Sequence, residues 1–161
     1  MMATVGIVAV LMAIAVFGLS PRYADLEGAH QELVNSIRET RLRATVKGAH
    51  FRLVPLETSY EIQRLQDADG DGLWDVDGSA RVQDVELPPG VKIAAASMGG
   101  LDAVVEFNTR GVMVEPTGGA AEVVQLTLTD HESRTRVVEV WPSGQVQNES
   151  ILGVTALGAL P

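Results

Sequence analysis

The sequence opens with an apolar segment of membrane-spanning length that runs directly into a charged, periodic stretch. Residues 1–20 contain no charged side chain, and Pro21 is the first proline of the chain. At a rise of about 1.5 Å per residue, a helix of this length covers about 30 Å, the thickness of the hydrocarbon core of a bilayer. We therefore expect residues 1–20 to form a transmembrane helix. Anchored chains of this kind work more often by assembly than by catalysis.

Two other interpretations of this segment stay open. A secretory signal peptide has a basic start and an apolar run of about 7–15 residues, whereas no basic residue precedes the run here and the run is longer. Small residues occur at signal-peptidase spacing in Ala13-Ile14-Ala15 and Gly18-Leu19-Ser20, but a cut after Ser20 would leave Pro21 next to the cleavage site. An ordinary single-pass anchor is the second alternative.

Residues 21–48 have the pattern of an amphipathic helix that continues the apolar segment. Glu39 and Arg43 form an i,i+4 pair in the favourable order, and Gly48 stands where a helix commonly ends. A proline at position 21 would bend or locally melt the helix. One face is marked by residues that step by three and four along the chain, namely Tyr23, Leu26, His30, Leu33, Ile37, Thr40 and Ala44.

Residues 49–161 alternate between apolar and polar side chains, as β-strands do. Turn sequences rich in proline and glycine separate these runs, and Asp130-His131-Glu132-Ser133 has the character of a hairpin tip. We expect one or two small antiparallel sheets whose apolar face is covered by the second half of the helix. The predicted strands are residues 50–54, 59–65, 80–86, 91–97, 103–108, 111–115, 122–130, 134–141 and 144–148.

The segment from Met1 to Val16 resembles the hydrophobic stem of type IV pilins and type II secretion pseudopilins. In that family a short basic leader is cut before an aromatic residue, which is N-methylated, and the stem then opens with Phe-Thr-Leu-Ile-Glu. Met1 corresponds to the position directly after this Glu. We therefore expect the leader, the cleavage site and the assembly glutamate to be encoded upstream of Met1.

Three further segments are similar to the GspH/FimT/FimU branch of minor pilins. Residues 33–48 match the end of its helix, residues 105–111 match its "I.F.P.G" segment, and residues 136–146 match its final hairpin. The order and spacing of these segments carry the resemblance, because each motif is weak by itself. The middle of the chain is poorly matched, and Pro21 lies about one helical turn later than the usual stem proline.

This resemblance implies an α+β fold in which a long N-terminal helix packs on a small antiparallel β-sheet head. Residues 1–20 would be the transmembrane half of that helix, residues 21–48 its amphipathic half, and residues 49–161 the head. It also implies a non-enzymatic subunit that assembles through its helix into a type IV pilus or a type II secretion pseudopilus. The implied partners are other pilin or pseudopilin subunits, the inner membrane and, if an upstream leader exists, a prepilin peptidase. The head would lie in the periplasm, or outside the cell within a filament.

Composition excludes several classes of function. The formal net charge is −9, with 21 acidic and 12 basic residues, which disfavours binding to nucleic-acid phosphates. The chain has no cysteine, so disulfides and thiolate metal sites are excluded. It also lacks a Gly-rich phosphate loop, a serine nucleophile elbow and an HExxH motif. We therefore predict no enzymatic activity.

The strongest local motif is an acidic loop, residues 67–75, which resembles the first half of a calcium-binding loop. Carboxylates at alternate positions converge on one ion, and Gly72 permits the tight turn that this requires. The twelfth position is Gly78 where an EF-hand has a bidentate Glu, so any binding would be weak, at about 10⁻⁴–10⁻³ M. A solvated acidic hairpin loop is the alternative. The candidate ligands are Asp67, Asp69, Asp71, the Leu73 carbonyl and Asp75.

Other ionisable residues give weaker signals. No two of the three histidines, His30, His50 and His131, are close enough in sequence to suggest a metal pair, so we interpret them as packing or surface residues. The basic residues at the end of the helix suggest a solvated face that caps carbonyls, and a contact with a neighbouring subunit is the alternative. They are Arg38, Arg41, Arg43 and Lys47. If no filament forms, the alternative function is a membrane-tethered, extracytoplasmic calcium-binding module that acts alone.

Overall fold

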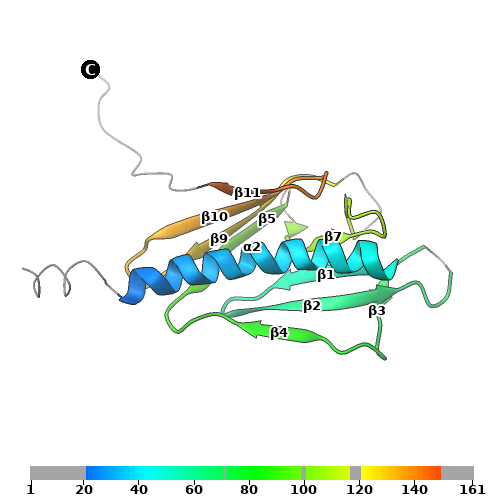
Figure 1. Cartoon of the computed structure of the whole chain (residues 1–161), viewed down its shortest axis with the longest axis horizontal. Helices are drawn as coiled ribbons and strands as arrows, with labels where there is room; N and C mark the ends of the chain where they lie inside the picture. Colours follow the sequence, from blue (N-terminus) through cyan, green and yellow to red (C-terminus); the bar gives the residue numbers. More distant parts are fainter. Residues whose placement is uncertain (1–20, 71, 99–100, 117–120, 150–161) are drawn as a thin grey trace, which may run out of the picture.

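The computed structural model describes residues 21–70, 72–98, 101–116 and 121–149 (Figure 1). The predicted membrane-spanning segment, residues 1–20, lies outside the described residues. Within the described part of the chain, no helix is both long and apolar enough to cross a membrane.

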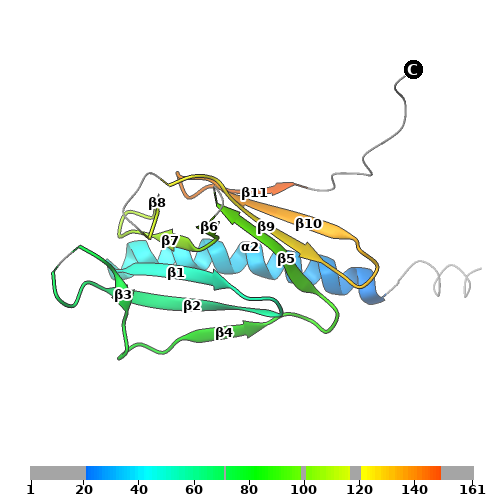
Figure 2. The ribbon, with the colours of Figure 1, turned by 180° about the vertical axis from the view of Figure 1, so that it is seen from behind.

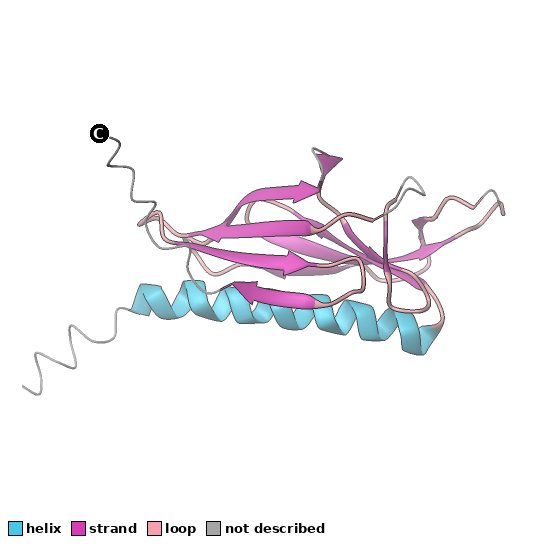
Figure 3. Cartoon of the chain, turned by 90° about the horizontal axis from the view of Figure 1, so that it is seen from above, coloured by secondary structure: helices cyan, strands magenta, loops and turns pink. Residues whose placement is uncertain are grey.

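One long helix, α2 (Pro21–Lys47), lies along the head (Figures 1 and 3). The helix ends where the sequence predicted, directly before Gly48. Gly48 has a φ of 58°, in the left-handed region that glycine commonly adopts after a helix. The Ala49 amide donates to the Ala44 carbonyl at 3.3 Å, the longer hydrogen bond of a Schellman motif. Ala44 and Ala49 are both buried, which adds the apolar contact that often accompanies this motif.

The head contains two antiparallel sheets. The first sheet has the strand order β3-β2-β1-β7-β8, with β4 also paired to β2. The second sheet has the order β11-β10-β9-β5-β6. The strands are β1 (His50–Pro55), β2 (Ser59–Gln66), β3 (Asp75–Val76), β4 (Gln83–Glu86), β5 (Lys92–Met98), β6 (Leu101–Asp102), β7 (Val105–Phe107), β8 (Met113–Val114), β9 (Val124–Thr129), β10 (Thr135–Val140) and β11 (Val146–Glu149).

The sequence pattern predicted this architecture well. Each of the nine predicted strands overlaps an observed strand, and the tip of the β9–β10 hairpin lies at residues 130–134 as expected. The two strands that were missed, β3 and β6, have two residues each, too few to show alternation. The α+β class with an antiparallel head is thus confirmed for the described residues, and the transmembrane half of the helix stays a prediction.

The hydrophobic core lies between α2 and the two sheets. The predicted helix face is buried at Leu26, His30, Leu33, Ile37, Thr40 and Ala44. From the sheets, fully buried side chains such as Leu53, Phe107, Leu126 and Val138 pack in the same cluster. Burying a large aliphatic or aromatic side chain contributes about 1.5–3 kcal/mol, so this shared core fixes the helix to the head. Figure 2 shows both sheets from the side away from α2.

Candidate functional site

The end of α2 is held to both sheets by a single guanidinium group. Arg41 Nε donates to the Gly111 carbonyl at 2.9 Å, and Nη1 donates to the Gly144 carbonyl at 3.0 Å. Gly111 lies in the β7–β8 turn of the first sheet, and Gly144 lies in the β10–β11 turn of the second. The two sheets also meet directly here, because the Met113 amide at the start of β8 donates to the Pro142 carbonyl in the β10–β11 turn at 3.0 Å. We call Arg41, Gly111 and Gly144 the Arg41 clamp.

The clamp requires glycine at both turns. Gly111 and Gly144 have φ angles of 71° and 77°, the left-handed region that glycine occupies without strain. A Cβ atom added to Gly144 would lie 2.5 Å from the Gly111 oxygen and 2.7 Å from Arg41 Nε. These turns therefore allow a close approach between two backbones and the helix side chain.

The basic residues at the helix end were interpreted from sequence as a solvated face that caps carbonyls. Arg41 does cap carbonyls, but they belong to turns 70 and 103 residues away in sequence. Arg43 forms the predicted i,i+4 pair with Glu39 at 2.6 Å and also donates to Gln83 of β4 at 2.8 Å. Part of the basic cluster therefore joins the helix to the head, which sequence spacing alone could not indicate.

The first half of α2 is joined to the sheets by polar contacts within the interface. Arg136 of β10 pairs with Glu27 at 3.1 Å, and its side chain is 8% exposed. The hydroxyl groups of Ser36 and Tyr60 share a hydrogen bond of 2.8 Å. The helix is thus fixed along its described length, by Glu27 near its start, Ser36 in its middle and the Arg41 clamp near its end.

His30 is buried in this interface and stays uncharged at neutral pH. Its side chain is 1% exposed, and neither ring nitrogen has a hydrogen-bond partner among the described residues. Burial lowers the pKa of His30, because the charged imidazolium loses its solvation. The Glu27 carboxylate at 3.9 Å and the nearby Val137 backbone, which forms no hydrogen bond of good geometry with the ring, oppose this shift. The sequence prediction of a packing histidine is consistent with this position.

The acidic loop folds around the first of its predicted ligands. The Asp67 carboxylate accepts the amides of Gly70 at 2.8 Å and Gly72 at 3.3 Å. Asp75 lies in β3, opposite Gln66, and Asp71 falls outside the described residues. In the part of the chain that is described, no group of three or more acidic or histidine side chains is arranged to hold a metal. Calcium binding by Asp67, Asp69, Asp71, Leu73 and Asp75 stays a prediction.

Asp77, which follows the acidic loop, forms local hydrogen bonds and an ion pair. Its carboxylate accepts the Ser79 amide at 2.9 Å and the Ser79 hydroxyl at 2.5 Å, and it lies 3.7 Å from Arg64. These hydrogen bonds lower the pKa of Asp77. Its side chain therefore stabilises the turn after β3.

A buried cluster that the sequence did not suggest joins the acidic loop to the first sheet. Trp74 stacks on His50, with ring centroids 3.6 Å apart and planes 5° from parallel. His50 Nδ1 lies 3.1 Å from Glu106 Oε1, and the Glu106 side chain is 3% exposed. Burial raises the pKa of Glu106, against the opposing effects of His50 and Arg52. His50 and Glu106 are 56 residues apart, so no local motif could reveal the pair.

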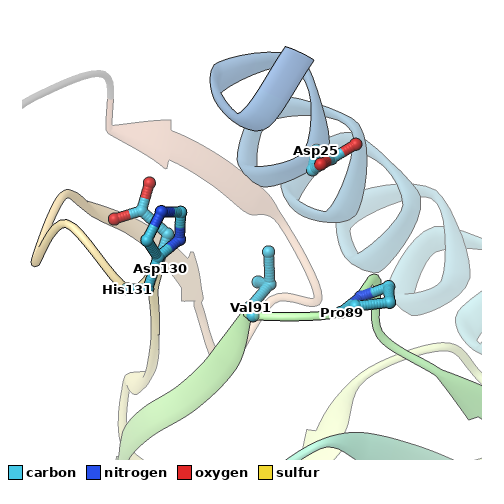
Figure 4. A pocket seen from close by; sticks show the side chains of 6 residues that line it. Asp25, Pro89, Val91, Asp130 and His131 are labelled. Atoms are coloured by element: carbon cyan, nitrogen blue, oxygen red, sulfur yellow. The ribbon is translucent and has the colours of Figure 1, made fainter. Parts of the chain in front are cut away.

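A hollow of about 400 Å³ lies near the start of α2 (Figure 4). Of the two acidic residues that line it, Asp130 accepts hydrogen bonds from the Glu132 and Arg134 amides and pairs with the Arg134 guanidinium at 2.6 Å. The hollow is lined by Asp25, Pro89, Gly90, Val91, Asp130 and His131.

The outer side of α2 carries two exposed apolar residues. Leu42 and Val46 are 62% and 74% exposed. They are four residues apart, so they lie on the same face of the helix.

Solved structures with the same architecture are minor pilins and pseudopilins. The type IV minor pilin FimU of Pseudomonas aeruginosa aligns over 80% of this chain and 90% of its own, with a TM-score of 0.57 and 16% identity. The minor pseudopilin EpsH of Vibrio cholerae aligns over 78% of this chain and 97% of its own, with a TM-score of 0.57 and 11% identity. The chain has the minor-pilin fold. No family model and no curated protein matches its sequence.

The resemblance drawn from the sequence is thus confirmed at the level of the fold. A second structure of Pseudomonas aeruginosa FimU, in another crystal form, aligns with a TM-score of 0.53 and 16% identity over 78% of this chain and 93% of its own. Similarity at this level of identity concerns the arrangement of the helix and the sheets.

Proposed function

We propose that this protein is a non-enzymatic minor pilin or pseudopilin subunit. In this proposal it assembles through its N-terminal helix, with other pilin-like subunits, into a type IV pilus or a type II secretion pseudopilus. The observation that carries the proposal is the minor-pilin fold with α2 fixed to both sheets. A helix that inserts between neighbours can position its head only if the two move as one body.

The contacts along α2 support this role. The Arg41 clamp binds one turn from each sheet, and Arg136 and Tyr60 hold the earlier part of the helix. Beneath them lies the shared apolar core. Interiors packed in this way transmit force with little deformation. Movement of the helix along a growing filament would therefore carry the head with it.

The apolar stretch of residues 1–20 supports the membrane part of the proposal. Before assembly it would span the inner membrane with the head in the periplasm, and in the filament it would pack against the stems of neighbours. Close approach of such helices is favoured by small residues, and the stretch contains Ala3, Gly6, Ala9 and Ala13. If a leader is encoded upstream of Met1, a prepilin peptidase would be a further partner.

The exposed side of α2 offers a direct test of assembly. The chain contains no cysteine, so a single introduced thiol is the only attachment site for a maleimide that carries a benzophenone, which on illumination forms a covalent bond to C–H groups of any neighbouring protein. We would place it at Val46, which is 74% exposed, and treat whole cells of the native host. The expected result is a covalent adduct with another pilin-like subunit, identified by mass spectrometry.

The matched control is Asp84→Cys, which lies at an exposed position of β4 on the head. If the helix faces the filament, the Val46→Cys adducts should depend on the other filament genes of the host. Adducts at Asp84→Cys should not show the same dependence. If neither variant forms an adduct while both react fully with a monofunctional maleimide, the protein acts alone. The membrane-tethered module would then be the better account.

Calcium binding by the acidic loop is a separate part of the proposal. The Asp67 carboxylate already gathers the amides of Gly70 and Gly72 around itself, which brings the start of the loop into a compact turn. Weak binding would suit the calcium concentrations found outside the cytoplasm. Such binding is compatible both with the filament role and with the tethered module.

A further inference from the structure

The two sheets of the head leave a hollow between the end of β1 and the first half of β5. Its volume is about 460 Å³, within the range of about 300–1,000 Å³ that is typical of ligand sites. Val54 and Pro55 line it from β1, and Ala94 and Ala96 line it from β5. Figure 2 shows these two strands next to each other, seen from the side away from α2. The hollow is therefore a mainly apolar site that lies apart from the helix.

Both strands that border the hollow have an edge without a partner strand. β7 pairs with β1 only over residues 51–53, so the end of β1 is open. β6 pairs with β5 only at Ser97 and Met98, and no strand of the described chain pairs with the same edge at residues 94–96. An open strand edge presents N–H and C=O groups that can act as a template for a further strand.

The sequence of β5 leaves room at this edge. Residues 94–96 are three consecutive alanines, and alanine is depleted in strands because it contributes little side-chain packing. Edges that are protected from pairing commonly carry charged side chains or proline, whereas Ala94 is exposed and uncharged. The Ile93 amide donates to the Glu57 carbonyl at 2.9 Å, so the start of β5 is held beside the first sheet. The alanines that follow remain available to a strand from another molecule.

Negative charge borders the hollow on the side of the first sheet. Glu61 of β2 lies directly opposite Val54 in register, and Asp84 of β4 lies opposite Glu61 on its other side. Like charges at directly opposed positions destabilise a sheet. Glu61 accepts a hydrogen bond from the neutral side chain of Gln63 at 2.6 Å. A basic group that reached Glu61 across Val54 would relieve this repulsion.

The basic residues close to the hollow are engaged elsewhere. Lys92 pairs with Glu57 at 2.6 Å, and Arg52 donates to Gln63 at 2.7 Å. Within the described residues, no basic side chain pairs with Glu61. The hollow thus combines an apolar lining, an open backbone edge and a carboxylate without a cation.

We propose that this hollow takes an extended segment of a partner protein. The segment adds as a strand to the open edge of β5, places small apolar side chains in the hollow and directs one basic side chain across Val54 to Glu61. In this mode of recognition the main-chain hydrogen bonds supply affinity, and the places for alternate side chains supply specificity. The contact goes beyond assembly through the N-terminal helix, so either proposal can fail without the other.

Binding of a synthetic peptide to the full chain in detergent tests the proposal. The probe is a short fluorescein-labelled peptide in which valine and threonine alternate and one central threonine is replaced by lysine. Fluorescence anisotropy measures its dissociation constant. The same peptide with glutamate in place of lysine should bind at least about tenfold more weakly, because Glu61 would repel it. Equal affinities of the two peptides, or no binding of the lysine peptide at about 1 mM, would overturn the proposal.

A peptide with methylated backbone nitrogens separates strand addition from simple apolar contact. It keeps the side chains of the lysine peptide but cannot donate the main-chain hydrogen bonds that a strand edge accepts. The proposal predicts that its binding is lost. Undiminished binding of the methylated peptide would contradict strand addition.

Substitutions in the chain locate the bound peptide. Ala94→Trp fills the hollow from an exposed position and should weaken binding of the lysine peptide at least about tenfold. Ala68→Trp, at an exposed alanine of the acidic loop, is the matched control and should bind as the unaltered chain does. Glu61→Gln should reduce the preference for lysine over glutamate, whereas Glu32→Gln on the exposed side of α2 should not. Equal effects within either pair of variants would place the peptide elsewhere and overturn the proposal.

Hydrogen exchange keeps the test valid if Ala94→Trp does not fold. In the unaltered chain, the lysine peptide should slow the exchange of the amides at residues 94–96. Protection confined to another edge strand, such as β4 or β11, would contradict the proposal.

Two other occupants of the hollow would give distinct results. A dimer of the unaltered chain in sedimentation analysis that Ala94→Trp abolishes would assign the hollow to a second copy. Peptide binding that requires removal of residues 150–161 would assign the hollow to the end of the chain itself. Either result would overturn the assignment to a partner protein.

Discussion

Arg41 of α2 donates a hydrogen bond of 2.9 Å to the carbonyl of Gly111, and the same guanidinium reaches Gly144 in the other sheet. One side chain therefore joins the helix to a turn from each half of the head. Because both acceptors are backbone oxygens, the contact depends on the shape of the turns rather than on the identity of partner side chains. This relation explains why both turns contain glycine with a positive φ.

Removal of the clamp should lower stability measurably. We expect Arg41→Ala to reduce the free energy of unfolding by about 1–2 kcal/mol, which is at the low end for hydrogen bonds from charged groups because the side chain is exposed. Urea denaturation followed by circular dichroism measures this change. Arg38→Ala is the control, since Arg38 is also exposed on α2, and it should change stability far less. Equal losses in the two variants would argue against the clamp.

A methyl group at Gly144 should be more harmful than one at another glycine with a similar backbone. Gly90 has a φ of 88°, and its added Cβ would meet only the His131 ring at 3.6 Å. Gly90→Ala should therefore cost about 1–2 kcal/mol from the left-handed conformation alone. Gly144→Ala has the same backbone cost plus the clash with Gly111 and Arg41, and should lose about 1–3 kcal/mol more. Thermal unfolding of both variants tests the difference, and similar melting temperatures would contradict it.

Acid should weaken the helix–sheet interface through His30. Its folded pKa lies below the ordinary value of 6.5, so the unfolded chain binds the proton more readily. The stability that His30 contributes is present above its unfolded pKa and is lost as the pH falls from about 6.5 toward the lower folded value. Chemical denaturation at several pH values should show this decline, and His30→Leu should reduce it. The same substitution at the exposed His131 should leave the decline intact, and a decline unaffected by His30→Leu would place its origin elsewhere.

Calcium should bind weakly to the acidic loop. Isothermal titration of the chain is expected to give a dissociation constant of about 10⁻⁴–10⁻³ M, because the loop lacks a bidentate Glu at its twelfth position. Asp67→Asn and Asp69→Asn should each reduce the affinity, whereas Asp84→Asn, which lies on β4, should not. If the unaltered chain gives no heat of binding at about 10 mM calcium, ten times the weak end of that range, the loop is an acidic solvated turn.

The sequence predicted the elements of this fold because its signals are local. The three- and four-residue steps from Leu26 to Ala44 identified the buried helix face, and Gly48 marked its end. Alternation along Val124, Leu126 and Leu128 identified a strand with one buried side. These patterns depend only on neighbours along the chain, so they can be interpreted without knowing the topology.

The contacts that organise the functional parts were not predictable in this way. Arg41 was assigned to a basic helix face, and nothing in the sequence indicated that its acceptors are turn carbonyls of the two sheets. His50 was interpreted as an ordinary histidine, although it pairs with Glu106 and supports Trp74. Such pairs arise from strand order, and strand order is set by the packing of the whole molecule rather than by local patterns.

The most direct test of the central claim is the chemistry of the native N-terminus. The protein would be recovered from envelopes and sheared filaments of its host, and its intact mass and N-terminal sequence determined. A filament subunit should begin upstream of Met1, with an N-methylated aromatic residue followed by a segment that contains the assembly glutamate. A native chain that begins near Val16 or at Pro21 would show that a secretory signal had been removed, and the assembly of this protein through an N-terminal stem would be contradicted.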